Sequence, residues 1–88
     1  MPYIDPNVRE FYEPELDALI AEFVIRGAKA GEFNYLVTRL ALAFVGRYPD
    51  YATFAAAIGG LEAAKLEFYR RHIAPYEDAK IEQNGNVQ

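Results

Sequence analysis

The chain has 88 residues and lacks both cysteine and serine, so that Thr38 and Thr53 carry its only aliphatic hydroxyls. Without cysteine it can form neither a disulfide framework nor a thiolate metal site. His72 is the only histidine, so the nucleophile and base pairs of covalent catalysis are missing as well. We therefore expect a protein that is not an enzyme and needs no cofactor.

Two further motifs of functional chemistry are absent. A di-iron bundle needs paired Glu-x-x-His motifs, but position 69, three residues before His72, is tyrosine. Gly59 and Gly60 fall inside a helical pattern, whereas a phosphate-binding loop lies between a strand and a helix. We expect no metal site within one chain.

Long apolar runs and basic charge are also lacking. No uninterrupted apolar run approaches the roughly 18 residues of a membrane span. The net charge of −4 works against binding to a phosphate backbone. Pro2, Asp5 and Pro6 stand where a signal peptide would need a basic start and an apolar block. We expect a cytoplasmic protein that binds neither nucleic acid nor membranes.

Apolar residues, in contrast, are abundant. They make up 52% of the chain and aromatic residues 15%, although a chain of this size buries only roughly 60–65% of its unfolded surface. This composition favours a well-packed core, within one chain or shared between subunits. The length allows one domain, residues 1–88, and no stretch alternates as a strand does. We predict an all-α fold, a small bundle of three main helices with short terminal helices.

The first third of the chain contains two helix-start signals. Asp5 followed by Pro6 is typical of an N-cap and first helical position, and predicts a short turn that ends near Tyr12. Pro14 is then expected to start the first long helix. Gly27 and Gly31 enclose the turn that ends it.

A second helix is predicted over residues 32–46, and it is apolar almost all round. One face carries Phe33, Leu36, Val37, Leu40, Ala41 and Phe44, and the opposite side carries Tyr35, Leu42 and Val45. Such a helix is buried on two sides. It is therefore expected to be central or to face a second copy of the protein.

Asp50 caps the third predicted helix. Gly59 and Gly60 in its interior indicate a backbone that approaches another atom closely. Pro75 removes a helical hydrogen bond and should kink or break this helix near Ala74. A last helical segment should reach about residue 83, and residues 86–88 should be a frayed tail.

The apolar face of the third helix includes three polar residues, Glu62, Lys65 and His72. One interpretation is an ordinary i,i+3 pair of Glu62 with Lys65, and a histidine at the edge of the core. The other is that the three line a polar pocket between helices, with Tyr69 and Tyr76 as its walls.

A second stripe on this helix consists of small side chains, Ala56, Gly60 and Ala63. Small residues at this spacing allow two helices to approach closely, and so predict a homo-oligomer contact. The alternative is that the stripe meets the first helix of the same chain.

Arg70 and Arg71 can bind phosphate in bidentate fashion, and Tyr69 and Tyr76 can stack on a base. Together with Glu62, Lys65 and His72, they form the predicted binding site for a small anionic ligand that carries an aromatic ring. An alternative is that Glu67 simply pairs with either arginine as an exposed salt bridge.

Several segments resemble a family of short uncharacterised bacteriophage and prophage proteins. They are residues 1–4 (MPYI), 31–35 (GEFNY), 63–71 (AAKLEFYRR) and 74–87 (APYEDAKIEQNGNV). The family's tail more usually reads Asn-Gly-Asp-Val, so Asn86 replaces a carboxylate here. The resemblance implies no established activity. It implies a phage accessory protein, a class whose members often bind host factors or capture signalling molecules of host defence.

We therefore expect a non-enzymatic phage protein that sequesters a small nucleotide-like immune signal in the host cell. The alternatives are an adaptor or inhibitor that binds a host protein, and an oligomer whose role is structural.

Overall fold

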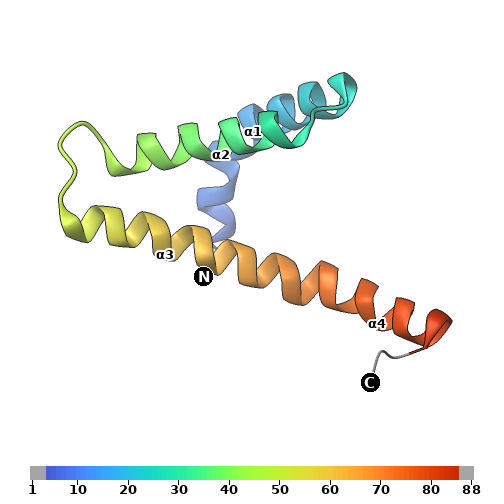
Figure 1. The fold of residues 1–88 in the computed structure, drawn as a ribbon. Coiled ribbons are helices and arrows are strands. Elements are labelled where there is room, and N and C mark those ends of the chain that lie inside the picture. Colours follow the sequence, from blue (N-terminus) through green and yellow to red (C-terminus); the bar gives the residue numbers. More distant parts are fainter. Residues whose placement is uncertain (1–3, 86–88) are drawn as a thin grey trace. The chain divides into compact units, whose positions relative to one another are not determined.

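A computed structural model describes residues 4–85, and this part of the chain is helical without any strand. The elements are α1 (Pro6–Arg26), α2 (Ala30–Val45), α3 (Tyr51–Phe68), the π-helical turn η1 (Tyr69–Ile73) and α4 (Ala74–Asn84) (Figure 1). The all-α prediction is thus confirmed, with three main helical stretches. The predicted frayed tail, residues 86–88, lies outside the described residues.

Helix α1 begins at the predicted cap and ends at the predicted Gly27, but the predicted break before Pro14 is absent. The Asp5 side chain accepts a hydrogen bond from the Asn7 N–H at 2.8 Å, and Pro6 occupies the first turn. The helix then continues through Pro14 to Arg26, so the prediction of a separate short turn that ends near Tyr12 is wrong. Proline has no backbone N–H, so one helical hydrogen bond is missing at Pro14. In an exposed helix, water can bind the carbonyl group that is left without a helical partner. Gly27, at φ 62°, ends α1 in the left-handed conformation.

Helix α2 agrees with its predicted range to within two residues. The Lys29 N–H donates to the Glu32 carboxylate at 2.9 Å, and Glu32 also lies 3.4 Å from the Arg26 guanidinium. These contacts hold the turn between α1 and α2. At the other end, the Gly46 N–H donates to the carbonyl of Leu42.

The described residues divide into two units, one up to residue 57 and the other from residue 58 onward. In the first unit, α1 and α2 line a small groove of about 180 Å³. Phe23 of α1 and Leu36 of α2 are half-buried beside it. Organisation as a single domain over residues 1–88 stays a prediction.

No side chain of the described residues is buried, so the expected core does not form there. Between α1 and α2 the described residues form one small groove, and most of the surface of each helix stays exposed. Large apolar residues are consequently exposed on every long helix, among them Phe11, Val24, Leu40, Phe44, Ile58 and Phe68. None of the described helices is long and apolar enough to cross a membrane.

Helix α3 begins after a cap at Asp50, as predicted. The Asp50 carboxylate accepts from the Thr53 N–H at 2.8 Å and from the Thr53 hydroxyl at 2.7 Å. Gly59 and Gly60 lie inside α3, but a Cβ added at either position would meet no other atom within 4 Å. The close approach expected at these glycines is therefore not present.

The backbone stays helical across Pro75, because the chain passes from α3 through η1 into α4 without leaving the helical region. Near the proline, the helix changes from α-helical to π-helical at Tyr69 and back to α-helical at Ala74. A bend of the axis at this point stays a prediction.

Replacing Pro14 by alanine tests the continuity of α1. If Pro14 lies in the helix interior, Pro14→Ala restores a hydrogen bond and should stabilise the protein by up to about 3 kcal/mol. Pro6→Ala is the matched control, since proline at the first position is well tolerated and little change is expected. Thermal unfolding followed by circular dichroism measures both. A neutral or destabilising Pro14→Ala would instead place the helix start at Pro14.

The Asp50 cap makes the stability of α3 depend on pH. Hydrogen bonds from the Thr53 hydroxyl and N–H lower the pKa of Asp50 below its usual value. Its contribution is present above the unfolded-state pKa of about 3.9 and is lost as pH falls through the lowered folded value. Asp50→Ala should lower the melting temperature at neutral pH by a few degrees. Asp50→Asn should keep the cap and lose this pH dependence; an unchanged acid transition would contradict the assignment.

Candidate functional site

The seven predicted ligand residues lie on one helical stretch that runs from the second half of α3 through η1 into α4. All belong to the unit from residue 58 onward. The structure divides them into three local groups with different partners. Two of these groups carry aromatic and cationic side chains that suit ligand binding.

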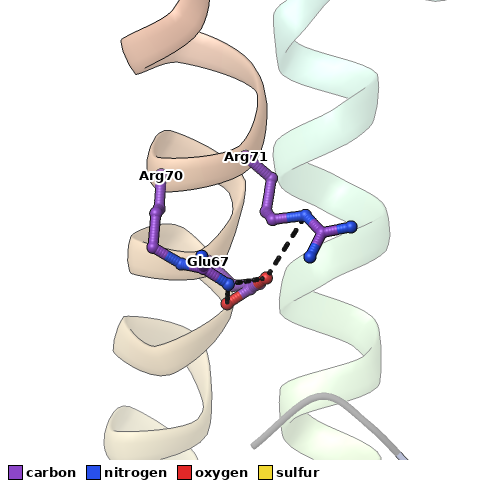
Figure 2. Close-up of polar contacts among 3 residues, drawn as sticks. All are labelled: Glu67, Arg70 and Arg71. Atoms are coloured by element: carbon purple, nitrogen blue, oxygen red, sulfur yellow. Dashed lines mark hydrogen bonds and ion pairs between the residues drawn. The ribbon is translucent and has the colours of Figure 1, made fainter.

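The first group is the arginine cluster, defined as Glu67, Arg70 and Arg71. Arg70 donates through one terminal nitrogen to both Glu67 carboxylate oxygens, at 2.9 and 3.1 Å, and the Arg71 Nε lies 3.9 Å from one of them (Figure 2). The Glu67 side chain is 22% exposed, whereas those of Arg70 and Arg71 are 65% and 57% exposed. One carboxylate thus orients two guanidinium groups that remain open to solvent.

The π-helical turn η1 sets the position of both arginines, and Pro75 explains why it forms. In an α-helix the proline ring would clash with the carbonyl of Arg71, four residues earlier. Instead the Ala74 N–H donates to the carbonyl of Tyr69, five residues earlier, so the turn is wider. Such π-turns are frequent at functional sites. Here the turn contains Arg70 and Arg71, which lie five and four residues before the proline.

The second group is the tyrosine groove, an open groove of about 540 Å³ along η1 and α4. Tyr69 donates its hydroxyl hydrogen to the Glu77 carboxylate at 2.5 Å. The Lys80 ammonium lies 5.6 Å from the centre of the Tyr76 ring, within the range of a cation–π contact. The complete lining is Tyr69, Ala74, Tyr76, Glu77, Asp78, Lys80, Ile81, Asn84 and Gly85.

The Glu77 carboxylate also changes the acidity of the neighbouring phenol. Its hydrogen bond and its negative charge raise the pKa of Tyr69 above the usual value. The contact therefore needs the neutral phenol, and it is lost as pH rises through this raised pKa. Near neutral pH the tyrosine is a hydrogen-bond donor fixed at one side of the groove.

The remaining predicted residues have ordinary helix neighbours. The Lys65 ammonium lies 3.2 Å from the Glu62 carboxylate, and both side chains are exposed, as the interpretation of a simple i,i+3 pair requires. The His72 ring lies 5.3 Å from the Phe68 ring, at an interplanar angle of 38°. A ligand-binding role for these three residues stays a prediction.

The predicted oligomer stripe is only partly covered. Ala63 is half-buried, whereas Ala56 and Gly60 are exposed, and a Cβ added at Gly60 would meet no atom within 4 Å. The contact with a second copy stays a prediction.

Glu77 and Lys80 line the tyrosine groove but are not among the seven ligand residues predicted from the sequence. The signal for Lys80 was available, because it follows Tyr76 by four residues and so lies on the same helix face. Glu77 follows Tyr69 by eight residues, and the π-turn lies between the two positions. Among the residues described, no group of three or more acidic, histidine or cysteine side chains is placed to hold a metal ion.

The Tyr69 contact can be tested through its titration. Glu77→Gln removes the negative charge next to the phenol, so the pKa of Tyr69 should fall toward the usual value. Glu82→Gln removes a carboxylate from the same helix outside the groove lining and serves as the control. Tyrosine ring resonances in NMR, assigned with Tyr69→Phe, report the pKa. Equal values in Glu77→Gln and the unmodified protein would show that the contact does not form in solution.

Comparison with known proteins supports the expected membership of an uncharacterised family. A family described as a domain of unknown function (DUF6899) matches residues 1–87. No curated protein and no solved structure matches the chain. Since the match covers nearly the whole sequence, the protein belongs to the DUF6899 family.

Proposed function

We propose that this protein is a non-enzymatic phage accessory protein that sequesters a small nucleotide-like signal of host defence in the host cytoplasm. The observation that carries the proposal is the arginine cluster, with two exposed guanidinium groups, next to the tyrosine groove on the same helical stretch. Guanidinium groups suit phosphate, and tyrosine rings suit a base.

Local charge supports binding of phosphate at the arginine cluster. Residues 62–72 carry three positive side chains, Lys65, Arg70 and Arg71, against the two negative ones of Glu62 and Glu67, which gives a formal charge of +1 in a chain whose total is −4. The side chains of Arg70 and Arg71 are 65% and 57% exposed, so a phosphate can approach both guanidinium groups while they contact Glu67.

The acidic side of the tyrosine groove determines how such a ligand would lie. Glu77 and Asp78 line the groove and repel a phosphate, so the phosphate belongs at Arg70 and Arg71. The base then lies over Tyr69 or Tyr76, where stacking contributes roughly 1–3 kcal/mol per base. Glu62, Lys65 and His72 are proposed to supply further polar contacts.

Homo-oligomerisation is part of the proposal, with Ala56, Gly60 and Ala63 as the contact stripe. The absence of buried side chains among residues 4–85 supports it, because an oligomer covers apolar surface that each unit leaves exposed. We further propose that the helix bends at Pro75, which brings the first turn of α4 toward the arginine cluster.

A second candidate function is that of an adaptor or inhibitor that binds a host protein. The observation that favours it is the apolar surface of α2, where five large side chains are exposed: Phe33, Tyr35, Leu40, Leu42 and Phe44. A purely structural oligomer is the third candidate.

Calorimetric titration tests the leading proposal directly. The protein is titrated with cyclic dinucleotides, cyclic trinucleotides and cyclic ADP-ribose isomers. Arg70→Gln and Arg71→Gln should each weaken binding by roughly 10- to 100-fold, because a charged hydrogen bond contributes about 1.5–3 kcal/mol. Arg47→Gln is the matched control, since Arg47 also lies 5.7 Å from a tyrosine ring but outside this stretch.

The absence of binding across this panel would refute the sequestration proposal. Recovery of a stoichiometric host protein in affinity capture would then favour the adaptor. Loss of binding in Arg47→Gln, with Arg70→Gln unaffected, would refute the assignment of the site.

A further inference from the structure

Helix α2 carries three large apolar side chains that are exposed on one face, and Val37, which lies between them, is half-buried. Phe33, Leu40 and Phe44 are 61%, 69% and 62% exposed. At 100° per residue these three and Val37 form a stripe within about 60° of the helix circumference. The groove shared with α1 is lined from a different side of α2, by Glu32, Leu36 and neighbours. Phe33, Leu40 and Phe44 are not among the residues that line this groove.

The spacing of this stripe is that of a helix-pairing seam. Phe33, Val37, Leu40 and Phe44 follow one another at intervals of four, three and four residues, which is the a/d pattern of a coiled coil. The pattern is the same when it is read in the reverse direction. In an antiparallel pair, Phe33 of each copy would lie opposite Phe44 of the other copy. Val37 of each copy would likewise lie opposite Leu40 of the other. Such self-complementarity is what a two-fold interface between identical chains requires.

The charged residues of α2 do not interfere with this seam. They are Glu32 and Arg39. Glu32 is engaged by the Lys29 N–H and by Arg26, and the Arg39 guanidinium donates to the Tyr35 hydroxyl at 2.7 Å. Parallel pairing would place Glu32 of one copy next to Glu32 of the other, and Arg39 next to Arg39. Antiparallel pairing separates the two Glu32 side chains by roughly 20 Å along the helix, and it also opposes the helix dipoles.

The exposed area of the stripe alone is smaller than that of a stable dimer interface, so pairing through it is expected to be weak. Phe33, Leu40 and Phe44 expose on the order of 350 Å² per copy, since a large side chain of this kind presents roughly 200 Å². Two copies thus contribute about 700 Å² before flanking residues are counted, and specific interfaces begin near 1,200 Å². An interface of this size is held weakly, so we expect dissociation at micromolar concentrations.

We infer that the Phe33–Phe44 stripe of α2 pairs antiparallel with the same stripe of a second copy. This inference rests on the proposed homo-oligomer and assigns it a surface other than the Ala56, Gly60 and Ala63 stripe. It also means that the partner bound to this surface of α2 is a second copy of the chain and not a host protein.

Two matched variants test the surface in the full-length protein. Leu40→Glu places a charge in the seam, whereas Leu42→Glu places it on the opposite side of α2, at a residue that is 59% exposed. In sedimentation at high micromolar concentration, the unmodified protein and Leu42→Glu should show at least twice the 10.0 kDa chain mass. Leu40→Glu should show half the mass of the unmodified protein. Circular dichroism verifies that both variants are helical.

Cysteine cross-linking tests the antiparallel register without a disruptive charge. The chain has no native cysteine, so introduced thiols have no competitors. A mixture of Val37→Cys and Leu40→Cys proteins should form mixed disulfides in preference to either homodimer, because only opposed Cβ atoms meet disulfide geometry. This measurement also decides the question if Leu40→Glu fails to fold.

A monomeric unmodified protein would overturn the inference and the proposed oligomer together. An oligomer that persists in Leu40→Glu and gives no mixed disulfide would overturn the α2 surface alone. Predominant disulfides between two Leu40→Cys chains would overturn the antiparallel register. Nucleotide binding is measured separately by calorimetry, so its failure is distinguishable from each of these results.

Discussion

The long helices of this chain carry apolar side chains on more sides than one neighbouring helix can cover. In the unit up to residue 57, α1 and α2 share one small groove, and Phe23 and Leu36 are no more than half-buried there. The hydrophobic effect makes the uncovered surface unfavourable in water, roughly in proportion to its area. The exposed residues of the α2 stripe belong to this uncovered surface, and the reversible spacing of the stripe supports the proposed pairing with a second copy of the same chain.

Pro75 imposes a second, more local constraint. Because it has no N–H and its ring excludes a regular α-turn, the chain adopts the wider turn Tyr69–Ile73. This turn contains Arg70 and Arg71, and the tyrosine groove follows from it along α4. A single residue thus determines where positive charge ends and where the acidic, aromatic surface begins. The proposed ligand, with phosphate at the arginines and its base over a tyrosine, matches that division.

Much of the helical structure could be predicted because its signals are local. Asp5 and Asp50 cap helices as expected, and Gly27 and Gly46 end them at positive φ. Pro14 misled the prediction, because a proline signals a helix start and an interior break equally well in sequence. That the chain belongs to an uncharacterised family was also predictable from the sequence, and the family match extends over nearly the whole chain.

The sequence by itself determined the helices, their caps and the residue types of the candidate site. Only the three-dimensional structure decided which of those residues act together. A constant 100° per residue cannot describe the π-turn, which shifts everything after Tyr69 relative to α3. Glu77 consequently reaches Tyr69 and Lys80 covers Tyr76, while Glu62 and Lys65 pair only with each other. Of the two interpretations that the sequence left open for Glu62 and Lys65, the structure shows the exposed i,i+3 pair.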